Sequence, residues 1–319
     1  MKKFSVLLAS FLLLIGVLVG CSGANTDESK EENTTQQSSA FPVTVKDALG
    51  NEITIEKEPE RIVSLIPSNT EIAFELGLGD KMVGVSDFDN YPEEVNNIEK
   101  IGGQEFNVEK ILSLNPDLVL AHQSGAHNAE EGLNQLRDAG VPVFVVKEAA
   151  SFDQVYETIQ TIGKITGTNN QASEIVQMMK TKVDEIEQKA AEIAEEEQMK
   201  VFMEVSGAPT LYTAGKGTFM DEMLTIINAK NIIEEEGWPQ VTEEAVIKAD
   251  PDVIITTYGY YVPDATEQIL NRDGWDNVSA VQNKRVYDVN SDLVSRPGPR
   301  LIEGVEELAK AVYPEIFDQ

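Results

Sequence analysis

The chain has 319 residues, with 55 Asp and Glu against 25 Lys and Arg, which gives a formal net charge of −30. This charge argues against nucleic acid as a partner, because phosphate binding needs clustered basic residues. It also opposes electrostatic attraction to an anionic membrane surface. The length exceeds that of one typical domain and suits two.

The first 20 residues have the pattern of a secretory signal peptide. Lys2 and Lys3 precede an apolar run, "FSVLLASFLLLIGVLV". A basic segment followed by a short apolar one predicts a signal over residues 1–20. Cys21 comes next and is the only cysteine in the chain. "LVGC" resembles the bacterial lipobox, whose Cys is lipidated and becomes the new N-terminus. An incidental free thiol is the alternative.

Residues 21–40 are expected to form a lipid-anchored tether. The sequence after Cys21, "SGANTDESKEENTTQQSSA", has almost no apolar content. Such a composition predicts a disordered, solvated segment. We therefore expect an exported protein that acyl chains hold on the outer face of a membrane. A single cysteine allows no internal disulfide, so the folded part must be stabilised by packing.

An N-terminal lobe is expected over residues 41–167. A hairpin, "FPVTVKDALGNEITIE", precedes alternating strands and helices. The expected strands are "RIVSLIPS", "KMVGVS", "PDLVLAH" and "VPVFVV", and the expected helices between them are "NTEIAFELGLG", "NVEKILSLN" and "NAEEGLNQLRDAG". Ser68 or Asn69 should cap the first helix. This alternation predicts βαβ units and a mostly parallel sheet.

A long helix is expected over residues 168–198. Its apolar positions recur at spacings of four and three, at Ile175, Met179, Val183, Ile186, Ala190 and Ile193. This spacing predicts an amphipathic helix. At 1.5 Å per residue, a helix of roughly twenty-five to thirty residues would span about 40 Å, enough to pass from one lobe to another. A coiled-coil segment is the alternative, but one isolated run does not sustain a coiled coil.

The α/β pattern resumes over residues 199–319. The expected strands are "KVFMEVS", "PDVIITT" and "RVYDVN", and the expected helices are "TFMDEMLTIINA", "TEEAVIKA", "ATEQILNR" and "RLIEGVEELAKAV". The predicted fold class is therefore α/β. It has two lobes, each with a mostly parallel sheet flanked by helices, joined by one long α-helix.

One unit occurs twice, as "VEKILSLNPDLVLA" and "TEEAVIKADPDVIIT". Each copy reads as a helix, a Pro-Asp corner and a buried strand. Glu109 and Glu244 fall in the first helical turn, where a carboxylate favours the helix dipole. Pro116 and Pro251 stand where the helix must stop. The repeat predicts two lobes of similar construction.

No catalytic constellation is evident. The two histidines, His122 and His127, have no cysteine nearby and make a poor metal site. There is no G-x-S-x-G elbow, and "AGKGT" lacks the full phosphate-loop pattern. We expect a protein that is not an enzyme and carries no cofactor or bound metal. A surface enzyme such as a metallohydrolase is the alternative from a different class.

Four further segments resemble one protein family. They are "PERIVSLIPSNTEIAFELGLGDKMVGVS", "DNYPEEV", "GWPQVTEEAVIKADPDVII" and "SRPGPRLIEGVEELA". Together with the lipobox and the long helix, they resemble the substrate-binding proteins of bacterial ABC importers, and most closely the cobalamin-binding branch. The resemblance implies capture of cobalamin or a related corrinoid in a cleft between the lobes. The ligand would pass to a permease dimer with ATPase subunits. A ferric siderophore or haem is the alternative ligand.

The resemblance also implies roles for single residues. Tyr91 and Trp238 match positions that stack against a large ligand, with core packing as the alternative for each. Glu109 and Glu244 match the acids that dock onto permease arginines. For these two, the alternative is a helix-start Glu that only stabilises its own helix.

Further candidate ligand contacts are polar, and they are Ser68, Asn69, His122, Arg296 and Arg300. Ser68 and Asn69 are expected in a strand-to-helix loop, where they would offer donors to the cleft. His122 is expected to contact the ligand or coordinate a cobalt or iron centre, or else to be a satisfied strand-end histidine. Arg296 and Arg300 would pair with ligand carboxylates or amides, or cap the last helix.

Overall fold

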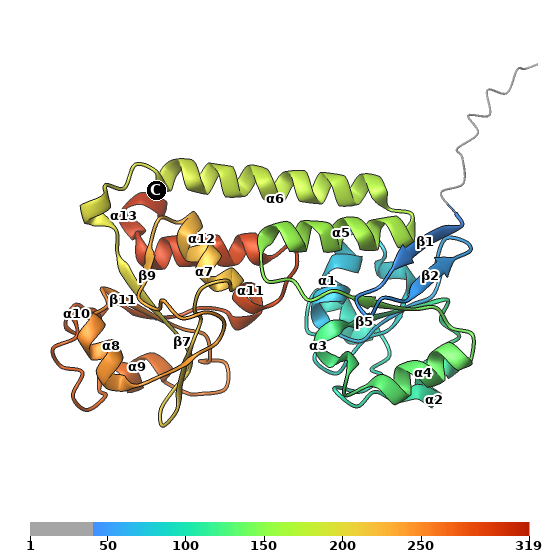
Figure 1. Cartoon of the computed structure of the whole chain (residues 1–319), viewed down its shortest axis with the longest axis horizontal. Coiled ribbons are helices and arrows are strands. Elements are labelled where there is room, and N and C mark those ends of the chain that lie inside the picture. The colour runs from blue at the N-terminus through green and yellow to red at the C-terminus, as the bar shows by residue number, and fades with distance from the viewer. Residues whose placement is uncertain (1–40, 319) are drawn as a thin grey trace, which may run out of the picture. The chain divides into compact units, whose positions relative to one another are not determined.

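The computed structural model describes residues 41–318 of the chain, so the expected signal peptide, Cys21 and the tether lie outside the described residues. It confirms the α/β fold class: two lobes, each with a mostly parallel sheet flanked by helices, are joined by the long helix α6 (Asn169–Ala190) (Figure 1). Within residues 41–318, no helix is both long enough and apolar enough to cross a bilayer.

The N-terminal lobe opens with an antiparallel hairpin of β1 (Val43–Lys46) and β2 (Glu52–Ile55), as predicted. A four-stranded parallel sheet follows, in the spatial order β4 (Met82–Gly84), β3 (Ile62–Ser64), β5 (Leu118–His122) and β6 (Val143–Val146). Its helices are α1 (Pro67–Glu75), α2 (Val108–Ser113), α3 (Gln123–Ala126), α4 (Glu130–Asp138) and α5 (Phe152–Thr166). The strands β3, β5 and β6 are buried along their whole length, as expected for a parallel sheet covered on both faces.

The cap of α1 differs from the prediction. The N-cap is Ile66, and Pro67 occupies the first helical turn. Proline has a fixed φ that suits this turn, and its missing N–H costs nothing there. Ser68 and Asn69 therefore lie inside the helix, and the prediction that one of them is the N-cap is wrong.

Helix α6 is amphipathic as predicted, with Ile175, Met179, Ile186 and Ala190 buried. It ends at Ala190 rather than near residue 198, and a turn of 3₁₀ helix (Glu195–Glu197) follows. The carboxylates of that turn oppose the negative end of the helix dipole, which accounts for the earlier stop.

The C-terminal lobe contains a six-stranded sheet. Its order is β10 (Gln240–Val241), β8 (Leu211–Thr213), β7 (Lys200–Ser206), β11 (Val253–Thr256) and β12 (Val286–Asp288), with β9 (Lys230–Asn231) also paired to β7. The pairs among β7, β9, β11 and β12 are parallel, whereas β8 and β10 are antiparallel to their neighbours. Its helices are α7 (Phe219–Ile226), α8 (Glu243–Ala249), α9 (Ala265–Leu270), α10 (Ser279–Gln282), α11 (Ser291–Ser295), α12 (Leu301–Val312) and α13 (Pro314–Phe317).

The repeated unit has the same structural role in both lobes. Asp117 accepts hydrogen bonds of 2.9–3.1 Å from the backbone N–H groups of Glu60 and Arg61, just before β3. Asp252 accepts one of 2.8 Å from the backbone N–H of Lys200, at the start of β7. Each Pro-Asp corner thus fixes the start of the neighbouring parallel strand, which confirms two lobes of similar construction.

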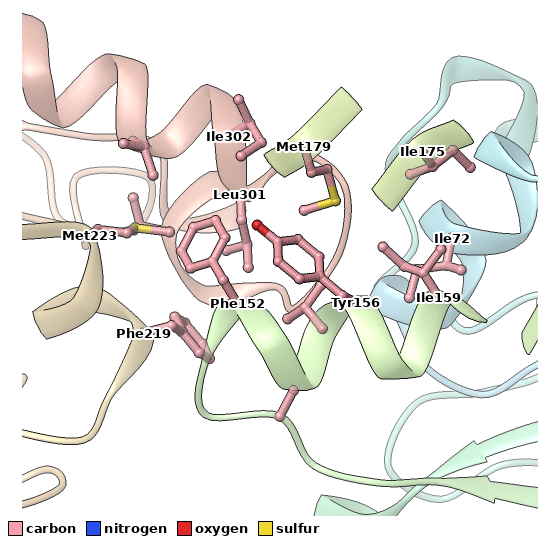
Figure 2. Packing of buried hydrophobic residues seen from close by; sticks show 14 of the residues in the cluster. Ile72, Phe152, Tyr156, Ile159, Ile175, Met179, Phe219, Met223, Leu301 and Ile302 are labelled. Atoms are coloured by element: carbon pink, nitrogen blue, oxygen red, sulfur yellow. The ribbon is translucent and has the colours of Figure 1, made fainter. Parts of the chain in front are cut away.

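One apolar cluster connects the two lobes on the side of α6. Phe152 and Tyr156 of α5 and Met179 of α6 gather with Met223 of α7 and Leu301 of α12 (Figure 2). Both lobes therefore share a continuous core in addition to their own smaller clusters. A polar contact reinforces this junction: the Glu222 carboxylate of α7 accepts a 2.8 Å hydrogen bond from the backbone N–H of Phe152.

Candidate functional site

The carboxyl ends of the parallel strands in the two lobes are joined by direct contacts. Ligands of open parallel sheets bind at this edge. The segment after β4 carries Asn90, and the segment after β12 carries Asp292 and Arg296. The Asn90 side chain donates a 2.9 Å hydrogen bond to Asp292 and accepts one of 2.7 Å from Arg296. The strand ends of the two lobes therefore meet here and define the candidate site.

At the centre of this contact is Glu71, a carboxylate of α1 that is 1% exposed. Arg296 Nη1 lies 2.7 Å from Glu71 Oε1, and Arg300 Nη1 lies 3.5 Å from the same oxygen. Burial raises the pKa of the Glu71 carboxyl, against the opposing effects of the Arg296 hydrogen bond and the charges of both arginines. Arg296 also pairs with Asp292 at 2.9 Å. Arg296 and Arg300 thus form an interlobe ion-pair cluster with Glu71.

Tyr91 belongs to the same contact. The guanidinium carbon of Arg300 lies 3.7 Å from the centroid of the Tyr91 ring, which is a cation–π geometry. Tyr91 is still 37% exposed, so part of the ring faces solvent beside the cluster. This placement, outside the apolar core, is compatible with the predicted contact to a ligand.

Trp238 lies at the other side of the C-terminal sheet. It is 49% exposed and sits in the turn before β10, where its neighbour Pro239 accepts a backbone hydrogen bond from Thr213 of β8. Strand β10 is one edge of that sheet and β12 is the other. With strands about 4.8 Å apart, four spacings separate these edges by about 19 Å. The structure therefore does not bring Trp238 to the interlobe cluster around Tyr91.

A cavity of about 420 Å³ opens at the carboxyl edge of the N-terminal sheet. Its lining is mostly apolar, with a few polar side chains, and includes Leu65, Ile66, Phe88, Phe106, His122 and Ser124. Phe88 is 58% exposed. A mainly apolar cavity with a few converging polar groups is the usual form of a small-molecule site.

His122 ends β5 inside this cavity and is 9% exposed. Its Nδ1 accepts a 3.2 Å hydrogen bond from the backbone N–H of Ser124 and lies 2.8 Å from Ser124 Oγ. Burial lowers the pKa of His122, against the opposing charge of Glu148. Because Nδ1 accepts a hydrogen bond from a backbone N–H, the neutral ring carries its own proton on Nε2. This tautomer suits hydrogen-bond donation to a ligand better than coordination of a metal centre through Nε2.

Ser68 and Asn69 are buried in the first turns of α1, not in a loop as expected. The Asn69 amide donates a 3.0 Å hydrogen bond to the carbonyl of Ala121, which precedes His122. Asn69 thus ties α1 to the strand end that bears the histidine. Contact of either side chain with a ligand stays a prediction.

The two glutamates of the repeat are exposed, in the first turns of α2 and α8. These helices lead directly into the parallel strands β5 and β11, so each runs antiparallel to the strand that it precedes. Their N-terminal ends therefore point toward the carboxyl edges of the sheets. Glu109 and Glu244 lie one in each lobe, toward the edges that form the candidate site.

Glu71 and Phe88 were missed by sequence reasoning. Glu71 had a signal, since it is an acid directly before the mostly apolar stretch "IAFELGLG", within the predicted helix. Phe88 lies two residues after the expected strand "KMVGVS", at the edge where parallel sheets place their ligands. Neither signal separates a site residue from an ordinary surface residue without the fold.

The sequence matches a family described as periplasmic binding proteins, over residues 62–293. It is 48% identical to a Bacillus subtilis (strain 168) protein described as an uncharacterized ABC transporter substrate-binding lipoprotein, with 100% of both chains covered. It is 33% identical to a cobalamin-binding protein of Halobacterium salinarum, over 86% of this chain and 75% of that protein.

Two solved structures have similar folds. One is a possible iron-binding (periplasmic solute-binding) protein from Staphylococcus epidermidis, 42% identical with a TM-score of 0.73, covering 81% of this chain and 100% of that one. The other is the periplasmic haem-binding protein RhuT from Roseiflexus sp., 27% identical with a TM-score of 0.71, covering 80% and 98%.

Proposed function

Since the chain belongs to the periplasmic binding protein family, we propose that it is the lipid-anchored substrate-binding component of an ABC importer. It captures cobalamin or a related corrinoid between its lobes and delivers it to a permease dimer with ATPase subunits. The cobalamin-binding relative in Halobacterium salinarum supports this choice of ligand. Proteins of this family bind substrates and are not enzymes, which leaves the surface-enzyme alternative without support.

The observation that carries the choice of ligand is the width of the candidate site. Exposed Trp238 directly precedes β10, one edge strand of the C-terminal sheet, and exposed Tyr91 of the other lobe contacts Arg300, which follows β12, the opposite edge strand. These two edge strands are about 19 Å apart by strand spacing. A small ion cannot touch both, whereas a large macrocycle with its side chains can. The apolar cavity at Phe88 offers further ring contact.

Polar groups at the site match the periphery of a corrinoid, which carries amide side chains around its ring. His122 supplies an Nε2–H donor from within the cavity. Arg296 and Arg300 supply guanidinium donors between the lobes. Ser68 and Asn69, the other candidate contacts, are buried in α1, the helix that carries Glu71. Donors of this kind fix the orientation of a ligand whose ring is held by aromatic contacts.

The two exposed glutamates support delivery of the ligand to a permease. A permease with two-fold symmetry presents the same patch twice, and Glu109 and Glu244 offer one carboxylate on each lobe. Carboxylate–arginine pairs would give this docking its direction. The core shared between the lobes limits their rotation, so capture and release need only small movements.

The anchor of this binding protein is Cys21. Lipidation at Cys21 would place residues 41–318 on the extracytoplasmic face of the cell membrane, within reach of the permease. The Bacillus subtilis relative, described as a lipoprotein and matched over 100% of both chains, supports this location.

A ferric siderophore or haem is the second candidate ligand. The iron-binding and haem-binding neighbours in the structure comparison favour it. The test is calorimetric titration of the chain from residue 22 onward with cyanocobalamin, haem and the ferric hydroxamate ferrioxamine B. Micromolar or tighter binding of cyanocobalamin alone is the expected result. Binding of haem or ferrioxamine B without cyanocobalamin would replace the proposed ligand.

A further inference from the structure

The segment after β11, "TYGYY", exposes two tyrosines side by side. Tyr260 is 76% exposed and Tyr261 is 56% exposed. Their ring centroids are 4.7 Å apart, at an interplanar angle of 74°. Exposed apolar side chains that lie together on a surface are a common mark of a binding site.

This segment is fixed to the edge of the sheet that faces the other lobe. Asp288, at the end of β12, accepts a 2.9 Å hydrogen bond from the backbone N–H of Gly259 and one of 3.1 Å from the Thr256 hydroxyl. A Cβ at Gly259 would collide with the Asp288 carboxylate, so the backbone packs directly on it. Strand β12 leads into α11, whose Asp292 bonds to Asn90 of the N-terminal lobe. The two tyrosines therefore stand at the same strand ends as the candidate site.

A buried polar cluster anchors Tyr258, which lies in this segment. The Tyr258 hydroxyl donates a hydrogen bond to Glu204, which is fully buried. Arg272 binds both oxygens of that carboxylate, at 2.7 and 2.8 Å, and its guanidinium lies 4.5 Å from the Trp275 ring. Tyr258 is thereby anchored, and the chain that continues to Tyr260 is held in place before any ligand arrives. Such preorganisation reduces the entropy lost on binding.

We propose that Tyr260 and Tyr261 form an aromatic platform for the flat ring of a tetrapyrrole-type macrocycle, corrin or porphyrin. This inference rests on the proposed function and narrows it to ligands with a planar ring. The pair, in T-shaped contact, presents a ring face and a ring edge, and aromatic groups prefer both offset-stacked and edge-to-face contacts. An open-chain hydroxamate wrapped around iron offers no such flat surface.

The test compares two double variants of the chain from residue 22 onward. Tyr260→Ala with Tyr261→Ala removes both rings, and Tyr260→Phe with Tyr261→Phe keeps them. The matched control is Met178→Ala, which truncates a side chain of α6 that is 45% exposed. Cyanocobalamin, haem and ferrioxamine B are titrated into each protein by calorimetry. Thermal unfolding of each variant confirms that it is folded, as the exposure of these side chains leads us to expect.

The alanine pair should weaken macrocycle binding by about 10- to 100-fold, whereas the phenylalanine pair and Met178→Ala should stay within about twofold of wild type. If wild type binds cyanocobalamin and the alanine pair binds equally well, the platform is refuted while the proposed function stands. If wild type binds haem but not cyanocobalamin, the proposed ligand is refuted. The platform is then tested by comparing the haem affinity of the alanine pair with that of wild type. If wild type binds neither macrocycle, the aromatic platform and the corrinoid as the proposed ligand are both refuted.

Discussion

Arg296 of the C-terminal lobe donates a 2.7 Å hydrogen bond to Glu71 of the N-terminal lobe, a carboxylate that is 1% exposed. This bond crosses between the lobes at the strand ends where the candidate site lies. It thereby links the stability of the protein to the arrangement of the site.

Replacing Arg296 by Met leaves Glu71 buried with only the more distant Arg300 for a partner. Breaking a buried ion pair from one side should lower the free energy of unfolding by about 3 kcal/mol. Glu71→Gln combined with Arg296→Met should recover part of this loss, since no buried charge is then left unpaired. Urea unfolding of the four proteins in this cycle measures the coupling. The exposed pair Lys182–Glu185 is the control, and Lys182→Met should cost less than about 1 kcal/mol. Equal losses at Arg296 and Lys182 would contradict the prediction.

Charge reversal at Glu109 and Glu244 together should abolish ligand uptake by cells and leave ligand affinity unchanged. Both carboxylates are exposed and lie outside the contacts described for the cavity and the interlobe cluster. The readouts are uptake of labelled cobalamin and calorimetric affinity. Glu131→Lys with Glu267→Lys is the matched control, because these exposed acids occupy first turns of α4 and α9, again one in each lobe. A collapse of affinity in the first variant would refute the docking role.

Glu222→Gln should change how stability depends on pH. Burial raises the pKa of the Glu222 carboxyl, the hydrogen bond from Phe152 opposes this, and the charges of Asp153, Asp221 and Glu187 raise it further. The folded state thus holds this proton more tightly than the unfolded chain does. The ionised carboxylate therefore destabilises the folded state above its raised pKa, and this effect disappears as pH falls toward the ordinary value of 4.5.

The stability advantage of Glu222→Gln over wild type should accordingly be greatest near pH 7 and shrink toward pH 4.5. Thermal unfolding across this pH range measures it. Glu157→Gln, at an exposed position on α5, is the control. If the stability advantage of Glu222→Gln over wild type grew as pH fell, the predicted direction of the pH dependence would be wrong.

We expect the fluorescence change on ligand binding to come from Trp238, and the stability of the core to depend on Trp275. Trp275 is fully buried and Trp238 is 49% exposed. Trp238→Phe should remove most of the emission that acrylamide quenches, together with the fluorescence change on ligand binding. Trp275→Phe should keep that change and lower the free energy of unfolding by about 2 kcal/mol, because it leaves a cavity in the core. A ligand signal that survives Trp238→Phe would remove Trp238 from the site.

The main elements of the fold could be predicted from the sequence because their signals are local and periodic. The aliphatic runs of β5 and β11 and the spacing of Ile175, Met179 and Ile186 in α6 each identify one element. Strands β8, β9 and β10 were missed, since two or three residues carry no periodicity. The predicted N-cap of α1 was wrong because Pro67 favours the first helical turn, which places the polar residues after it inside the helix.

The site was less accessible to sequence reasoning. Tyr91 and Trp238 were selected by resemblance and His122 as a polar candidate, and all three lie on the lobes' strand-end loops or edges. The partnership of Glu71 with Arg296 joins residues 225 positions apart, so no local pattern indicates it. Tyr260 and Tyr261 follow a strand in the same way as many surface residues do. Their significance comes from Asp288 and from Tyr258, which fix the segment in three dimensions.

The core shared by α5, α6, α7 and α12 has a consequence for biosynthesis. A polypeptide emerges N-terminus first, so α5 is made well before α12. Until Leu301 and Ile302 arrive, the faces of Phe152 and Tyr156 that they cover remain open to solvent (Figure 2). The first lobe therefore cannot complete its core on its own, and the newly made chain is most vulnerable to aggregation and proteolysis in this interval. A fragment that ends after α5 should aggregate when expressed alone.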